Sequence, residues 1–440
     1  MVAGLDAALG DGLARLDGER AAALTDLAAA LAASPLGPAV AEAAEKIAAG
    51  SVTDEHLAAL AGARTALFGA LHDADLAALD AALGRTRAEW REPAAEAPAP
   101  GGGPLAGGRS WLRELAIAGW RGVGPDLVSA ADQAVEALLA DPARRRLAVL
   151  LDGLAAEQRA ASPVAAMERL PLRRWADLWA RALLLAREGE PAAPAETVSG
   201  RLLILGADAH EHGTVAQVQA HAILEPAAGG PPRLVRTAVS AGKVDTITGP
   251  AVWRLPHRHP ALLAALAERR ALEIAELPLL PGGDLLWDDT RATVGEPTDP
   301  FATARVLLPL AVAPPVPPLE RHPVRIAEPV LVEGYGSDGV TLGLDGITLP
   351  LDARRLPARG PLTPRLVAAS SACIGLLRRD GDRWLLQPLA LQATVKRAPV
   401  EAHSGDWALG VTDPRIAKAE ARAGDPVAVL RERAGRLLRK

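Results

Sequence analysis

The sequence predicts an α+β fold, in which an N-terminal helical half of Ala/Leu-rich bundles is followed by a C-terminal half rich in antiparallel β structure. Up to residue 189, apolar residues recur at the three- and four-residue spacing of one helix face. From Arg201 onward they alternate with polar residues, as in a half-buried strand. Two Asp-Gly pairs near the C-terminus separate strand-like runs, and hairpin turns favour these residues. A chain of 440 residues is too long for one core, so several domains are expected.

The first domain, residues 1–92, is predicted to be a helical bundle. Apolar periodicity favours helices at 4–34, 38–49 and 54–83. The Pro- and Gly-rich residues 93–108 are predicted to form a linker, because alternating Pro and Ala favour extended chain and a glycine cluster adds freedom. A phosphate-binding loop is excluded there, since it needs Lys-Ser or Lys-Thr after the glycines, whereas Arg109 and Ser110 follow.

Residues 109–189 are predicted to form a second helical domain, organised around a tryptophan-bearing helix at 170–188. Trp175 and Trp179 lie one turn apart on its apolar face. We expect this face to pack in a core, since helical aromatic stripes are usually buried within their own chain. The alternative is a docking surface, for which the candidate partner-binding residues are Arg173, Arg174, Trp175, Trp179 and Arg181.

The strand half is predicted to contain a mixed β domain at 200–310 and an antiparallel hairpin domain at 324–413. The first of these includes one helix at 261–276. The second contains two hairpins, in which residues 340–344 pair with 347–351 and residues 373–379 pair with 383–395. The turns are Asp345-Gly346 and Asp380-Gly381. A basic helix at 414–440 is expected to end the chain.

Charge and composition narrow the possible functions. The net charge of −5 argues against a nucleic-acid partner. The charge is unevenly distributed: residues 1–92 carry 14 acidic and 7 basic side chains, whereas residues 415–440 carry 8 basic and 3 acidic ones. The single cysteine, Cys373, suits a reducing compartment, and no apolar stretch is long enough for a membrane helix. We therefore expect a soluble, cytoplasmic protein without a membrane partner.

Histidine spacing gives the only indication of metal chemistry. Asp208, His210 and His212 alternate along the chain, which on a strand would place them on one face. Zinc sites need three or four ligands with supporting hydrogen bonds. Gly206 and Gly213 bracket this group and indicate an exposed turn instead. We therefore expect no metal and no cofactor, with these three residues kept as candidate ligands.

No catalytic residue is predicted. The Gly-x-Ser-x-Gly elbow of serine hydrolases is absent. Cys373 lies in an apolar strand without a nearby histidine, a setting typical of a buried small hydrophobe. Asp284, Asp288 and Asp289 have no evident catalytic partner and are interpreted as part of a polar loop.

Two stretches resemble a known group of proteins. These are LRRWADLWARALL at 172–184 and GLLRRDGDRWLLQPL at 375–389. They are similar to segments of uncharacterised bacterial accessory proteins grouped with MoxR-type AAA ATPases, VWA-domain proteins and SWIM zinc-finger proteins. The resemblance implies an accessory subunit whose partners include a MoxR-type AAA ATPase and a VWA-domain protein. The chain lacks the ATPase's Walker motif and the Cys-rich ligand set of a SWIM finger.

The sequence therefore predicts a non-catalytic accessory or scaffold protein of a multi-protein, ATPase-linked bacterial system. One alternative is a single-stranded nucleic-acid-binding module on a small β-barrel, because such barrels bind strands through basic grooves and stacking aromatics. A second alternative is a metal-dependent enzyme that uses the cluster around His210 and His212.

Overall fold

The computed structural model confirms the α+β class and divides the chain into two compact units. It describes residues 1–86, 104–141, 144–188, 196–211, 215–244, 246–280, 283–311, 328–344, 346–356, 360–380 and 383–437. The helical unit consists of the described residues within Met1–Ala74 and Trp90–Ala193. The β unit consists of those within Asp75–Glu89, Pro194–Pro315 and Ala327–Lys440. Among the described residues, no helix has both the length and the apolar character needed to cross a membrane.

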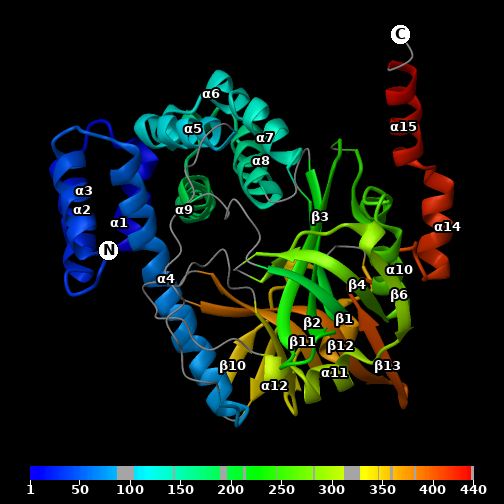
Figure 1. The fold of residues 1–440 in the computed structure, drawn as a ribbon. Helices are drawn as coiled ribbons and strands as arrows, with labels where there is room; N and C mark the ends of the chain where they lie inside the picture. Colours follow the sequence, from blue (N-terminus) through cyan, green and yellow to red (C-terminus); the bar gives the residue numbers. More distant parts are fainter. Residues whose placement is uncertain are drawn as a thin grey trace. The chain divides into compact units, whose positions relative to one another are not determined.

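The helical unit is built from helices of very different length (Figure 1). They are α1 (Val2–Asp11), α2 (Gly18–Ala30), α3 (Gly37–Ala48), most of α4 (Asp54–Ala82), α5 (Pro104–Ala118), α6 (Pro125–Ser129), α7 (Ala131–Leu139), α8 (Arg145–Ala160) and α9 (Leu172–Glu188), with 3-10 turns η1 (Trp120–Gly122) and η3 (Val164–Ala166).

The helix predicted at 4–34 is two helices, α1 and α2. Gly12 ends α1 with φ of 96°, a conformation that favours glycine. A Cβ there would lie 2.6 Å from the Ile117 carbonyl oxygen, so the close approach also requires glycine. Asp17 then caps α2 by accepting a hydrogen bond from the backbone N–H of Arg20 at 2.9 Å. Local turn chemistry thus breaks a continuous apolar pattern.

One hydrophobic core joins the two predicted helical domains, 1–92 and 109–189. The cluster contains Leu9 and Leu60 from the first and Leu112, Leu154 and Trp179 from the second. The two predicted helical domains therefore form one helical unit with a common core. The linker prediction of 93–108 also changes at its end, because α5 begins at Pro104; residues 93–103 lie outside the described residues.

The first sheet of the β unit closes into a small barrel. Its strands have the order β1-β2-β3-β5-β4-β6, and β4 also pairs with β1, so that the first five strands form a ring. Neighbours in the ring are antiparallel except β3 and β5, which are parallel. The strands are β1 (Glu196–Glu211), β2 (Val215–Pro226), β3 (Arg233–Gly242), β4 (Arg270–Leu279), β5 (Asp284–Leu285) and β6 (Ala292–Pro297).

The connection from β3 to β4 fills one part of the barrel core. The turn η4 (Gly249–Arg254) and α10 (Pro260–Glu268) contribute Trp253, Leu262 and Leu266 to the apolar cluster inside the ring. The helix predicted at 261–276 ends at Glu268, because Arg269 adopts a left-handed conformation with φ of 52° and the chain continues as β4. Beyond β5, the 3-10 turn η5 (Asp289–Arg291) leads into β6.

Two further sheets complete the β unit, and both predicted hairpins are present. One sheet has the order β13-β12-β11-β7 and the other β10-β9-β8. Leu344 pairs with Ile347 across a two-residue turn, as predicted. Asp380 pairs with Arg383, so that β11 extends one residue further than predicted and Asp380 belongs to the strand. Residues 381–382 lie outside the described residues. The elements are α11 (Pro300–Val306), α12 (Leu308–Ala311), β7 (Pro329–Glu333), β8 (Gly336–Ser337), β9 (Thr341–Leu344), β10 (Ile347–Pro350), η7 (Ala353–Arg355), α13 (Pro364–Ala368), β11 (Ser370–Asp380), β12 (Arg383–Val395) and β13 (Ala398–His403).

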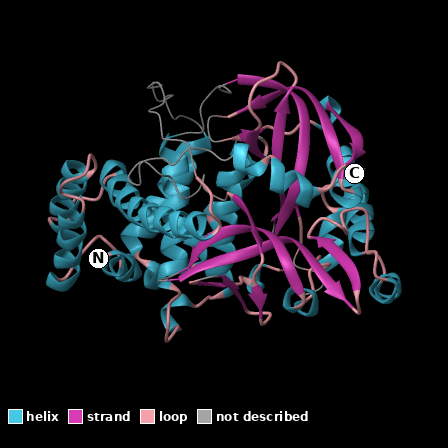
Figure 2. Ribbon diagram, turned by 90° about the horizontal axis from the view of Figure 1, so that it is seen from below, coloured by secondary structure: helices cyan, strands magenta, loops and turns pink. Residues whose placement is uncertain are grey.

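The four-stranded sheet covers an outer face of the barrel, so that the predicted domains 200–310 and 324–413 share a core. Leu205 and Ile223 of the barrel belong to one buried cluster with Ile374 and Ala390 of β11 and β12 and with Phe301 of α11. Figure 2 shows the strands of the β unit in two groups. This sheet-on-barrel interface contains the main polar cluster described below.

The predicted basic helix at 414–440 is two helices, α14 (Pro414–Ala423) and α15 (Pro426–Leu437), drawn in red in Figure 1. Gly424 separates them with φ of 84°. Asp425 then caps α15 by accepting backbone hydrogen bonds from Val427 at 3.0 Å and Ala428 at 3.1 Å.

Candidate functional site

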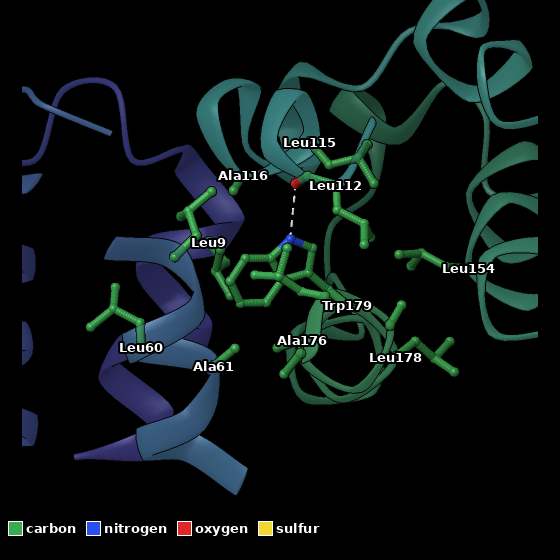
Figure 3. Packing of buried hydrophobic residues seen from close by; sticks show 14 of the residues in the cluster. Leu9, Leu60, Ala61, Leu112, Leu115, Ala116, Leu154, Ala176, Leu178 and Trp179 are labelled. Carbon is green, nitrogen blue, oxygen red and sulfur yellow. Dashed lines mark hydrogen bonds between the residues drawn. The ribbon is translucent and has the colours of Figure 1, made fainter. Parts of the chain in front are cut away.

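The tryptophan-bearing helix α9 lies in the core of the helical unit. Trp179 is fully buried, and its indole N–H donates a hydrogen bond to the Leu112 carbonyl at 2.9 Å (Figure 3). Trp175 is also buried, and its ring meets that of Trp120 edge-on with centroids 6.2 Å apart. The structure therefore confirms the prediction that the apolar face of this helix packs in a core. The alternative prediction, that Trp175 and Trp179 bind a partner, is wrong, because both rings are buried in the core of the helical unit.

The three candidate arginines of α9 differ in exposure. The Arg174 side chain is 48% exposed and forms an ion pair with Glu157 at 2.8 Å. Arg181 pairs with Asp177 at 2.9 Å, as their four-residue spacing suggests. The Arg173 guanidinium lies over the Phe68 ring, 4.7 Å from its centroid. Arg174 is therefore the candidate most open to a partner.

A buried arginine that the sequence did not reveal ties α9 to the N-terminal helices. Arg64 of α4 is fully buried and donates to Asp6 of α1 at 2.8 Å and to Asp177 at 3.3 Å. It also donates to the Arg173 carbonyl at 3.2 Å. Burial raises the pKa of Asp6, and the Arg64 guanidinium opposes that rise. The partners are far apart in sequence, so no local pattern could have identified this group.

A second buried polar cluster lies between the barrel and the four-stranded sheet, and a β-bulge places its central residue. Along β1 the pairing shifts between Ile204 and Gly206. Before the shift, side chains alternate as usual, so that Leu203 and Leu205 face the four-stranded sheet. Because of the extra residue, Ala207 faces the barrel core instead of continuing this series. Side chains alternate along a strand, so Asp208 faces the four-stranded sheet. Without the bulge, it would face the apolar barrel core.

Asp208 is almost fully buried, and both of its carboxylate oxygens have partners. Arg378 of β11 donates to Oδ2 at 2.8 Å, and Gln387 of β12 donates to Oδ1 at 2.7 Å. Nε2 of His210 lies 2.7 Å from Oδ2. Arg378 also donates to the Gln387 amide oxygen at 2.6 Å. These four side chains, from β1, β11 and β12, are called the Asp208 cluster below.

The electrostatics of the Asp208 cluster favour a permanently ionised carboxylate. Burial by itself raises the pKa of Asp208, but His210 and Arg378 more than compensate and hold it well below its usual range. On the neighbouring strand, His221 is 1% exposed, and no described residue hydrogen-bonds to its Nε2. Burial and the nearby Arg236 lower the pKa of His221 to about 3. This imidazole is therefore neutral at ordinary pH.

The candidate metal ligands are only partly brought together. His210 lies within β1 rather than in the predicted turn, beside Asp208, and His212 lies outside the described residues. Among the residues that the structure describes, no group of three or more His, Cys, Asp or Glu side chains is placed to hold a metal ion. Asp284 forms a two-pronged ion pair with Arg236, and Asp288 caps η5; neither interaction was predicted.

A third polar network stabilises the end of β13. Glu401 accepts from Gln392 at 2.8 Å and from Arg269 at 3.2 Å, and it lies 2.7 Å from Nε2 of His403. The hydrogen bond with His403 lowers the pKa of Glu401 to about 2. Arg269 also pairs with Asp406 at 3.1 Å. This network joins β12 and β13 to the residue between α10 and β4, and sequence spacing gave no sign of it.

Comparisons with known proteins gave no significant match to a family model, to a curated protein or to a solved structure.

Proposed function

We propose that the protein is a non-catalytic accessory subunit of a cytoplasmic, ATPase-linked bacterial system, with a MoxR-type AAA ATPase and a VWA-domain protein as partners. One observation carries the proposal. Asp208, the best-placed group for acid–base or metal chemistry, has both oxygens engaged by Arg378, Gln387 and His210 of its own chain. A carboxylate held in this way joins two sheets, and three of its roughly four acceptor positions are used by side chains of its own chain.

The positions of the two family-like stretches support the same proposal. Residues 172–184 lie in α9 and supply core side chains of the helical unit. Residues 375–380 and 383–389 lie in β11 and β12, which cover the barrel, and include Arg378 and Gln387 of the Asp208 cluster. Similarity confined to segments that build the fold implies a shared architecture rather than a shared reaction.

Affinity purification from the bacterial host tests this proposal. The tagged chain is expected to co-purify with a AAA ATPase of the MoxR type, identified by mass spectrometry. Arg174→Glu reverses an exposed charge of α9, and Arg383→Glu reverses an exposed charge of β12 as the matched control. We expect recovery of the ATPase to fall with the first variant only. Recovery of no ATPase, or bound zinc or manganese at one ion per chain, would contradict the proposal.

The closed barrel favours the nucleic-acid alternative. Five-stranded barrels of the oligonucleotide-binding type bind strands on the outer face of their second and third strands. Here Ile223 of β2 belongs to a buried cluster with Ile374 and Ala390 of the four-stranded sheet, and Leu234 of β3 packs against it. The accessory role therefore stays the first choice. Titration with fluorescent single-stranded DNA at low and at higher salt distinguishes the accessory role from nucleic-acid binding. Counterion release would make the affinity for DNA fall steeply as salt rises.

A further inference from the structure

Helix α14 carries an exposed stripe of unpaired cations. Arg415, Lys418 and Arg422 follow one another at three- and four-residue spacing, and all three are exposed. Ile416, on another side of the helix, packs against the barrel core. None of these three cations has an ion-pair partner among the residues that the structure describes. They are called the basic face below.

The helical hairpin α2–α3 carries the opposite charge. Glu19 and Asp26 lie two turns apart on α2, and Glu42 and Glu45 lie one turn apart on α3. All four are exposed, and none has an ion pair within the described parts of the chain. The inner sides of both helices supply core leucine, valine and isoleucine side chains. Lys46 is also exposed on α3, but the surface remains net negative. These four carboxylates are called the acidic face.

We propose that the basic face of one molecule binds the acidic face of a second copy, so that the protein self-associates head to tail. Three unpaired cations on α14 and four unpaired carboxylates on α2 and α3 provide the complementarity. A polyanion such as nucleic acid fits the basic face less well, because the chain as a whole carries a charge of −5. The two faces differ, so each added copy presents a free face, and the assembly grows unless the rotation closes a ring.

The strength of this association follows from the kind of contact. Exposed ion pairs are individually weak and are screened by salt. The proposed contact is therefore reversible, is seen at high protein concentration, and weakens when salt shortens the range of the charges from about 10 Å at 0.1 M to about 3 Å at 1 M. This inference is independent of the ATPase-linked role.

Sedimentation velocity of the full chain tests the proposal by charge reversal. In low salt, we expect the weight-average sedimentation coefficient of the wild type to rise with concentration and to lose that rise in about 0.5 M NaCl. The basic-face variant, Arg415→Glu with Lys418→Glu and Arg422→Glu, should stay monomeric. The acidic-face variant, Glu19→Lys with Asp26→Lys, Glu42→Lys and Glu45→Lys, should also stay monomeric.

Controls separate this contact from a general charge effect. The triple variant Arg365→Glu, Arg383→Glu and Lys396→Glu makes the same charge change at exposed positions outside the basic face, and it should associate like the wild type. In a mixture of the two variants, the unchanged acidic face of the first should bind the unchanged basic face of the second. The two reversed faces also carry opposite charges, so the mixture should associate with rising concentration as the wild type does. The proposal is overturned if the wild type is monomeric at all concentrations or if its association survives high salt. It is also overturned if the basic-face variant associates as strongly as the wild type. Binding of single-stranded DNA by the basic face without self-association overturns it too.

Discussion

Replacing Trp179 by alanine is expected to unfold much of the helical unit. The indole is fully buried in a cluster that includes Leu9, Leu60 and Leu115. Removing a buried aromatic ring costs about 3–5 kcal/mol, from lost burial and from the cavity left behind. The Leu112 carbonyl also loses its indole donor, which adds about 1 kcal/mol. We therefore expect a total loss of about 4–6 kcal/mol in the free energy of unfolding.

Two matched variants divide that loss into its parts. Trp179→Phe keeps most of the apolar ring but removes the hydrogen bond, so it should cost about 1–2 kcal/mol. Trp384→Ala removes a half-buried ring from the β unit, whose indole donates to the Thr348 carbonyl at 3.2 Å. That variant should leave the helical unit unchanged.

Hydrogen exchange of the intact chain, followed by mass spectrometry, is the appropriate assay because it reports each unit separately. The full chain is needed, since α9 shares its core with α1 and α4. We expect faster exchange in peptides from α1, α5 and α9 of Trp179→Ala and unchanged exchange in the β strands. If Trp179→Ala exchanges at the wild-type rate throughout α5 and α9, Trp179 does not contribute to the core, and α9 becomes a candidate docking surface again.

Three further predictions follow from the buried polar groups. The pKa of His221 is about 3 in the fold against an ordinary value of 6.5, so stability should be lost as the pH falls below 6.5, by about 2 kcal/mol at pH 5. His221→Gln should remove that part of the pH dependence of the unfolding free energy, measured in guanidinium. If the unfolding free energy of the variant falls between pH 7 and pH 5 as much as that of the wild type, His221 is not the group responsible. Arg64→Met should destabilise the helical unit by about 3–5 kcal/mol, because it leaves Asp6 buried without its cation; a change below about 1 kcal/mol in thermal or chemical unfolding would argue against this ion pair. Cys373 is buried, and burial raises the pKa of its thiol, so a thiol reagent should label it only upon unfolding; rapid labelling of the native protein would contradict this.

The parts of the fold that the sequence predicts correctly are those fixed by neighbouring residues. The spacing of Trp175 and Trp179 identifies α9 and its buried face. A two-residue turn sets the pairing of Leu344 with Ile347. The shift from helical to alternating periodicity predicts the α+β class, although it misses the breaks at Gly12 and Gly424, where single glycines end helices within apolar or charged runs.

The candidate site depends on contacts that no local pattern encodes. Asp208 and His210 stand out in the sequence as possible ligands, but Arg378 and Gln387 lie about 170 residues further along the chain. The bulge in β1 determines which side Asp208 faces, and a one-residue shift in pairing is invisible in alternation of small and polar residues. Arg64 resembles any surface arginine on an Ala/Leu-rich helix until Asp6 and Asp177 surround it.

A double-mutant cycle between Asp208 and Arg378 tests most directly whether the Asp208 cluster joins the barrel to the four-stranded sheet. The unfolding free energies of the wild type, Asp208→Asn, Arg378→Met and the double variant would be measured in guanidinium by tryptophan fluorescence. If the ion pair at 2.8 Å couples β1 to β11, the double variant should be more stable than the sum of the single losses predicts, by about 1–3 kcal/mol. Losses that add to within about 0.5 kcal/mol would contradict the structural role and leave Asp208 free for chemistry.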